Sequence, residues 1–141
     1  MIKKASAIWR GGIKDGGGTI STETGVLRDA PYGFKSRFEN GKGTNPEELI
    51  GAAHAGCFSM ALSLMLGEAG MTPEKIETHA EVMLEKLADG FSITASHLNV
   101  VAKIPGADRA KFLEVANKAK AGCPVSKVLT AKISMDARLE G

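Results

Sequence analysis

The spacing of apolar residues changes along the chain between a period of two and a helical period. Alternation over residues 3–9 and 19–22 predicts two short strands, joined as a hairpin through the glycines at 16–18. The segment 31–38 predicts a third strand, which ends before the loop 41–43. The three glycines lack the Gly-Lys-Ser/Thr ending of a phosphate-binding loop, so they are interpreted as a turn.

The clearest helix start lies between the two halves of the chain. Asn45 suits the N-cap, Pro46 the first helical position, and the acidic pair Glu47 and Glu48 the positive end of the helix dipole. Residues 49–69 are apolar on nearly every face. A helix of this kind is expected to be buried. We therefore predict a long buried central helix, and its large apolar surface indicates a dimer.

The second half predicts a long hairpin over 76–84 and 91–104, turning at Asp89-Gly90. Asp108 suits the cap of a helix that ends near residue 122, with apolar residues 112, 115, 116 and 119 on one face. A short helix over 124–129 and a strand over 132–139 complete the chain. This order predicts a single α+β domain, residues 1–141, with mostly antiparallel sheet.

Composition narrows the classes of function. The chain has 141 residues, a net charge of +2, one Trp, one Tyr and five Phe, which argues against a nucleic-acid partner. No secretory h-region follows the first lysines, and we expect no apolar run long enough to cross a membrane. A cytoplasmic location is therefore predicted. There a stable structural disulfide is rare, so the two cysteines are expected to serve packing, metal binding or chemistry.

Each cysteine has two interpretations. Cys57 lies on the apolar helix among small neighbours, where a free cysteine often serves as a small buried hydrophobe. Cys123 precedes Pro124, which places it at the N-cap of a new helix, where a thiolate is favoured; a merely tolerated cap is the alternative. They do not form a CxxC pair, and no metal site is predicted. If the thiols meet, they can act as attacking and resolving pair.

A cysteine that attacks as a thiolate needs a nearby cation. Arg37 is the candidate, oriented by a carboxylate of Glu47 or Glu48, although a solvated strand charge and a helix-dipole charge are the simpler interpretations. His54 lies one turn before Cys57 and suits a base, a metal ligand or, more commonly, a hydrogen-bonded core histidine. His79 and His97 lie in strand patterns and are interpreted as structural.

Several long segments together resemble one family, the OsmC branch of the OsmC/Ohr hydroperoxide reductases. The resemblance covers essentially the whole chain. It is carried by residues 18–27, 31–34, 37–39, 43–70 and 118–126.

The resemblance implies an intertwined homodimer with active sites at the subunit interface and a two-cysteine mechanism. Carried over residue by residue, it makes Cys57 the peroxidatic thiol, Cys123 the resolving thiol, Arg37 the active-site arginine and Glu47 its partner. It implies reduction of organic hydroperoxides and regeneration by an external dithiol such as a dihydrolipoyl group, with no cofactor. We add the hypothesis of an apolar substrate pocket lined by Phe38, Phe58 and Met60.

Two other functions compete with a peroxidase. A cysteine hydrolase would use Cys57 with His54 and would keep its activity after Cys123→Ser. A redox switch would oxidise once per molecule, without turnover under excess dithiol.

Overall fold

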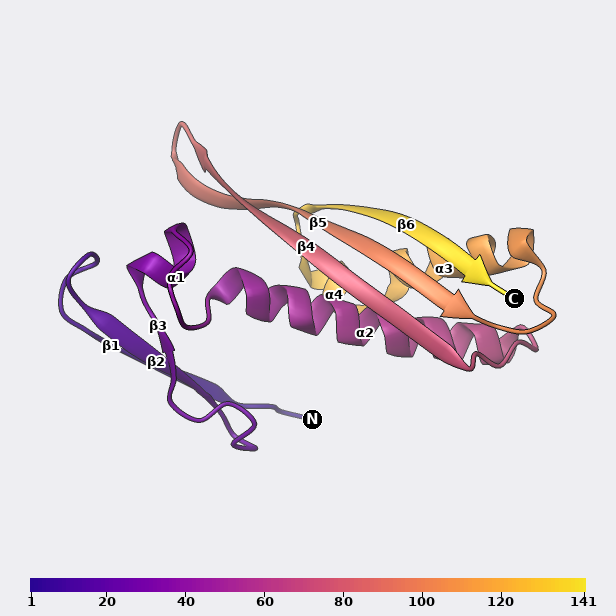
Figure 1. Cartoon of the computed structure of the whole chain (residues 1–141), viewed down its shortest axis with the longest axis horizontal. Helices are drawn as coiled ribbons and strands as arrows, with labels where there is room; N and C mark the ends of the chain where they lie inside the picture. Colours follow the sequence, from indigo (N-terminus) through magenta and orange to yellow (C-terminus); the bar gives the residue numbers. More distant parts are fainter. The chain divides into compact units, whose positions relative to one another are not determined.

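The computed structural model describes residues 1–141, and the chain folds as two units, Met1–Leu49 and Ile50–Gly141 (Figure 1). The first unit contains an antiparallel sheet in the order β1-β2-β3, formed by Ala5–Arg10, Gly17–Thr22 and Ala30–Tyr32. The predicted N-terminal hairpin is confirmed, but Gly17 and Gly18 belong to β2 rather than to the turn. A Cβ at Gly18 would collide with the backbone carbonyl oxygen of Ile8 and lie 2.6 Å from Cε1 of Tyr32, so this strand position requires glycine.

The predicted strand over 31–38 is wrong in its second half. Strand β3 ends at Tyr32, and Phe34–Phe38 form a short helix, α1. Ser36 explains the change of direction, because its Oγ accepts from the backbone N–H of Gly33 at 2.9 Å and donates to the Gly33 carbonyl at 3.1 Å. Such local side-chain bonds to the backbone compete with strand pairing.

Helix α2 runs from Pro46 to Glu68, as its N-terminal signals predict. The Oδ1 atom of Asn45 accepts from the backbone N–H of Glu48 at 2.7 Å, which confirms the predicted cap. After the helix, Gly70 adopts a φ of +80°, a left-handed conformation that glycine enters without strain.

The second unit contains the sheet β4-β5-β6, formed by Lys75–Leu87, Gly90–Lys103 and Lys132–Glu140. Strands β4 and β5 form the predicted long antiparallel hairpin. Strand β6 pairs with β5 in parallel, because the chain first crosses over through α3 (Arg109–Gly122) and α4 (Pro124–Val128). The α+β class with mostly antiparallel sheets is confirmed.

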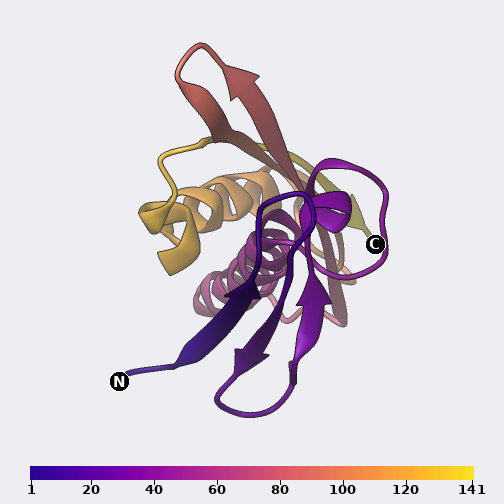
Figure 2. The same cartoon turned by 90° about the vertical axis from the view of Figure 1, so that its left-hand side faces the viewer.

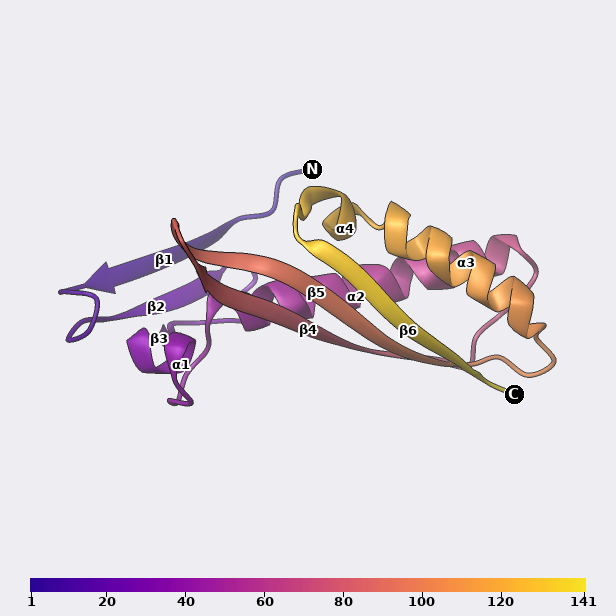
Figure 3. The ribbon, with the colours of Figure 1, turned by 90° about the horizontal axis from the view of Figure 1, so that it is seen from above.

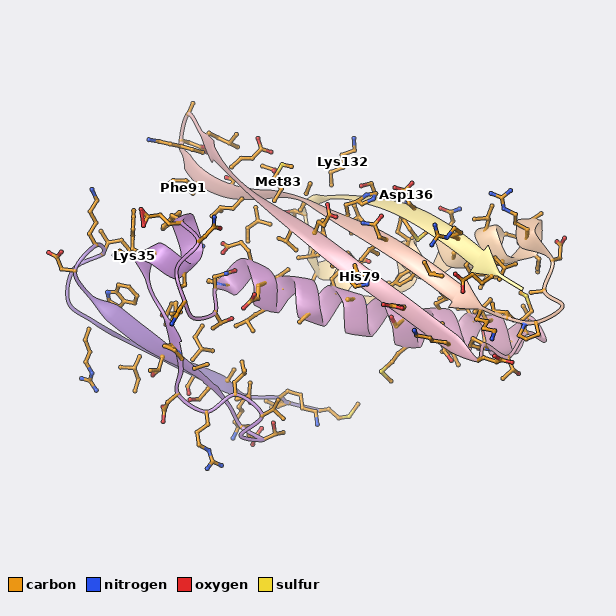
Figure 4. All side chains as sticks on the ribbon, in the orientation of Figure 1. Lys35, His79, Met83, Phe91, Lys132 and Asp136 are labelled. Carbon is orange, nitrogen blue, oxygen red and sulfur yellow. The ribbon has the colours of Figure 1, made fainter.

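Helices α2 and α3 lie side by side on one face of this sheet (Figures 2 and 3). Period-two alternation turns the apolar residues of β5 toward them, and α3 contributes the four apolar positions that its pattern predicts. The opposite face is polar and carries His79 on β4 and Asp136 on β6 (Figure 4). The buried core consists of Phe58, Leu62, Leu66, Leu98, Val100, Ala102, Ile104, Phe112, Val115, Ala116, Ala119 and Cys123.

The prediction that α2 is buried holds for one face only. Phe58, Leu62 and Leu66 have no exposed surface, whereas Met60 and Leu64 are 78% and 64% exposed. The helix is also long and apolar enough to cross a membrane by length and composition, which corrects the expectation of no such run. Core helices of water-soluble proteins can be equally long and apolar, so these two properties do not distinguish a core helix from a membrane-spanning one. An exposed apolar face of this kind is typical of a surface that packs against another protein surface.

Candidate active site

The fold brings the two cysteines together, which the sequence could not establish. Cys57 comes from the middle of α2, and Cys123 lies at the junction of α3 and α4. Both thiols are free, and Cys123 lies close enough to Cys57 to influence its pKa. Cys57 is partly exposed, whereas Cys123 is completely buried. The two thiols therefore differ in their access to solvent.

The surroundings of Cys57 favour the neutral thiol. Burial raises its pKa, and the neighbouring Cys123 raises it further through its hydrogen bond and charge. A hydrogen bond with the Val125 backbone acts in the opposite direction and lowers the pKa. No cation is among the groups that shift the pKa of Cys57.

Cys123 links two helices, as its predicted cap position requires. Its backbone N–H donates to the Ala119 carbonyl at 3.0 Å and closes α3, while its Sγ accepts from the backbone N–H of Ser126 at 3.3 Å and caps α4. Its S–H also donates to the hydroxyl Oγ of Ser126 at 3.2 Å. These bonds fix the position of the sulfur, which solvent does not reach.

His54 is completely buried, and both its ring nitrogens are occupied by serines. Nδ1 lies 2.7 Å from Oγ of Ser96 on β5, and Nε2 lies 2.8 Å from Oγ of Ser126 on α4. The interpretation of a hydrogen-bonded core histidine is confirmed. Burial lowers the pKa of His54, so the ring is neutral near pH 7. Sequence reasoning missed both serines, because they come from elements distant in the chain.

The first unit contains the predicted ion pair of Arg37 on α1 with Glu47 in the first turn of α2. The Nε and Nη2 atoms of Arg37 both donate to Oε1 of Glu47, at 3.1 and 2.8 Å. Glu48 has a different role, since it accepts from the hydroxyl of Thr44 at 2.7 Å. The guanidinium also lies over the ring of Phe38, 5.5 Å from its centroid.

The three residues predicted to line a substrate pocket have different surroundings. Phe58 is completely buried in the core of the second unit, and Met60 is largely exposed. Residues two apart on a helix do not face each other, so the structure does not bring these two together. Phe38 belongs to the first unit, where its ring contacts that of Phe34 at 5.0 Å. No group of three or more His, Cys, Asp or Glu side chains suitable for a metal ion occurs in the structure.

The sequence pattern of the OsmC family, described as OsmC-like protein, matches residues 39–138. The chain is 60% identical over 138 residues to Peroxiredoxin OsmC of Escherichia coli (strain K12), covering 98% of this chain and 96% of that protein. It is 32% identical over 124 residues to the organic hydroperoxide resistance protein OhrB of Bacillus subtilis (strain 168), covering 87% and 88%. The chain therefore belongs to the OsmC family.

Solved structures agree with this assignment. The crystal structure of the organic hydroperoxide resistance protein OhrB of Bacillus subtilis superimposes with a TM-score of 0.68 at 28% identity, covering 97% of this chain and 98% of that chain. An OsmC-like protein from Mycoplasma pneumoniae gives a TM-score of 0.77 at 16% identity and covers 100% and 99%, which supports the fold alone.

Proposed function

We propose that this protein is a thiol-dependent peroxidase that reduces organic hydroperoxides to alcohols. The observation that carries this function is the contact between a reachable thiol, Cys57, and a completely buried one, Cys123. Membership of a family whose relatives are named as a peroxiredoxin and as organic hydroperoxide resistance proteins supports the same activity. The protein is thus a peroxiredoxin-like enzyme.

The chemistry uses both sulfurs in sequence. The Cys57 thiolate attacks the distal oxygen of the hydroperoxide, the O–O bond breaks, and the alkoxide takes up a proton and leaves as an alcohol. Cys57 then carries a sulfenic acid, which condenses with the Cys123 thiol to give a disulfide and one water. An external dithiol reopens the disulfide by exchange and becomes a disulfide itself.

Arg37 supplies the positive charge that the surroundings of Cys57 lack. Its guanidinium stabilises the thiolate in the first step and then the oxygen that leaves the peroxide. Glu47 fixes the direction of the guanidinium through two hydrogen bonds to one carboxylate oxygen. This pairing supports a role for Arg37 beyond that of a solvated surface charge.

The working form is a homodimer. The exposed apolar face of α2, with Met60 and Leu64, supports this assembly, as do Met83 and Phe91 near the end of the β4–β5 hairpin, which are 52% and 55% exposed (Figure 4). A second copy of the chain would remove these surfaces from water. The family match over 39–138 crosses the boundary between the two units, which supports a single domain over residues 1–141.

The substrate is an organic rather than an inorganic peroxide, held by an apolar pocket in the dimer to which Phe38 and Met60 contribute. Phe58 supports that pocket from the core. The reductant is a dithiol such as a dihydrolipoyl group, and no cofactor takes part. We place the protein in the cytoplasm, where reducing conditions keep both thiols free between turnovers.

The test follows consumption of cumene hydroperoxide by the purified protein with excess dihydrolipoamide, for the wild type and for Cys57→Ser. We expect many turnovers in the wild type, none above the dithiol blank in the variant, and much slower consumption of hydrogen peroxide. A single oxidation without turnover would instead support a redox switch. A cysteine hydrolase would cleave esters, but His54 directs both its nitrogens at serines rather than at Cys57.

A further inference from the structure

A continuous line of hydrogen bonds connects Cys123 with the centre of the core. From the sulfur it passes through Oγ of Ser126 (3.2 Å) to Nε2 of His54 (2.8 Å), and from Nδ1 of His54 to Oγ of Ser96 (2.7 Å). All four residues are almost completely buried, with at most 6% of their surface exposed. They come from α2, β5, α4 and the α3–α4 junction, so only the tertiary structure assembles them.

Packing alone does not explain this arrangement. An imidazole and two hydroxyls carry a desolvation cost in a core, and apolar side chains of the same shape avoid that cost. The line also ends on the thiol that solvent cannot reach. A buried thiol that must ionise in order to react has no water to accept its proton, so a protein group has to do so.

The direction of the bonds suits proton transfer. Because the S–H of Cys123 donates to Ser126, the single O–H of Ser126 can donate to Nε2 of His54, and Nδ1–H then donates to Ser96. When the protons move one place along this line, Nε2–H points to Ser126 and the Ser126 O–H points to the sulfur. The same atoms then stabilise a Cys123 thiolate without moving.

We propose that His54 is the proton acceptor for the resolving thiol, acting through the hydroxyl of Ser126 in the second step of catalysis. The inference rests on the proposed peroxidase function. Ser126 touches the reacting sulfur, and His54 acts through it as a positioning residue that also holds the proton.

In the second step one proton moves along this line and one S–S bond forms. The Cys123 proton passes to Oγ of Ser126 while the hydroxyl proton of Ser126 passes to Nε2 of His54. The sulfur of Cys123 attacks the sulfur of the Cys57 sulfenic acid, the S–S bond forms and the S–O bond breaks. The departing hydroxide takes up one proton from the solvent to become water, and His54 returns the proton that it received to the solvent, so no net proton is gained or lost.

The titratable groups around His54 allow this role. Cys57 lies on the same helix, Cys123 is reached through Ser126, and β5 presents the uncharged Ser96. Burial is the cause of the lowered pKa of His54, and no charged side chain contributes to it. The ring is therefore neutral across the neutral range, and its Nε2 is placed by the bond to Ser126 to take a proton transiently while the thiol reacts.

The test separates the two chemical steps in the full-length protein. Reduced wild type, His54→Gln and Ser126→Ala are each mixed with one equivalent of cumene hydroperoxide at pH 6–9. Alcohol release reports the first step, and rapid-quench mass spectrometry of the Cys57–Cys123 disulfide reports the second. His97→Gln is the matched control, because Nδ1 of His97 also bonds a serine, Ser134 at 2.6 Å, but on the polar side of the sheet.

We expect both variants to release alcohol within about twofold of the wild-type rate and to form the disulfide about a hundredfold more slowly at pH 6. The wild-type rate of disulfide formation is expected to be nearly flat between pH 6 and 8. In His54→Gln it should rise about tenfold per pH unit, because hydroxide must then remove the proton. A merely structural histidine would not change the shape of this profile.

A folded variant that forms the disulfide at the wild-type rate over the whole pH range overturns the proposal, as does an equal slowing of both steps. If His54→Gln does not fold, Ser126→Ala decides, because it keeps the ring and the backbone N–H bond to the sulfur. A wild type that forms no Cys57–Cys123 disulfide overturns the proposed function and the relay together. A normal disulfide in the wild type with unchanged variants overturns only the relay.

Discussion

Arg37 directs two N–H groups at a single oxygen of Glu47, Oε1, at 3.1 and 2.8 Å, while the other carboxylate oxygen is buried without a partner. A bidentate pair would use both oxygens. A buried carboxylate oxygen without a hydrogen bond costs about 1–3 kcal/mol. The arrangement therefore holds the guanidinium from one side only, and Oε2 is free to accept from a further donor.

Removing the charge of Glu47 should slow the first chemical step, the reaction of Cys57 with the hydroperoxide. In Glu47→Gln the guanidinium loses its charged partner and its fixed direction, so we expect sulfenic acid formation on Cys57 to slow by about tenfold to a hundredfold. The second-order rate constant with cumene hydroperoxide measures this effect. Glu48→Gln is the control, since Glu48 bonds Thr44 instead, and an equal loss there would count against a specific role for Glu47.

Replacing the buried thiol should separate the two steps of the reaction. In Cys123→Ser the first turnover should proceed at nearly the wild-type rate, because Cys57 remains reachable. The sulfenic acid then has no internal partner and accumulates, which trapping with dimedone and mass spectrometry would reveal. Steady turnover with dihydrolipoamide at the wild-type rate would contradict the role of Cys123 as resolving thiol.

Phe58 and Met60 should differ sharply in their effect on folding. Phe58 is completely buried in the core, so Phe58→Ala should lower the free energy of unfolding by about 3–5 kcal/mol. Met60 is 78% exposed in the single chain. Met60→Ala should therefore change the free energy of unfolding of the monomer by less than about 0.5 kcal/mol. Urea unfolding followed by circular dichroism measures both values. Similar losses would contradict the described burial.

The exposed apolar face of α2 should decide the oligomeric state. Leu64→Glu places a charge on that face, where it would have to be buried without a partner in a dimer. We expect sedimentation to show a dimer for the wild type and a monomer for Leu64→Glu. Val26→Glu, which changes an 84% exposed residue of the first unit, serves as the control. A dimeric Leu64→Glu protein would show that this face lies outside the interface.

The buried histidine should make stability fall in mild acid. The pKa of His54 is lowered from its ordinary value of 6.5, so below that pH the unfolded chain binds a proton that the folded protein resists. The stabilisation is complete above pH 6.5 and is lost as the pH falls, with a slope of at most about 1.4 kcal/mol per pH unit.

Urea unfolding at pH 7.5 and 5.5, for the wild type and His54→Gln, isolates this effect. The wild type should lose more stability over this interval than the variant does. The lowered pKa values of Glu77 and Glu114 act below 4.5, outside the interval. Identical pH dependence in the two proteins would show that His54 takes up its proton as readily when folded as when unfolded.

Local signals in the sequence were sufficient to predict most of the helices and strands. Asn45 and Pro46 predict the start of α2, Asp108 the start of α3, and Asp89-Gly90 the turn of the hairpin, because caps and turns depend on side chains within a few residues. Helix α1 was missed although the bonds that form it are also local. The bonds of Ser36 to Gly33 outweigh an extended pattern that residues 31–38 otherwise share with strands.

The sequence by itself also determined the class of chemistry, since two cysteines without a CxxC spacing and the family motifs around them indicate a thiol mechanism. Only the tertiary structure decided which thiol is reachable, because burial depends on how α2, α3 and the sheet pack. The same holds for the bonds of His54 to Ser96 and Ser126. Hydrogen bonds between elements distant in the chain leave no periodic pattern in the sequence, so no local signal predicts them.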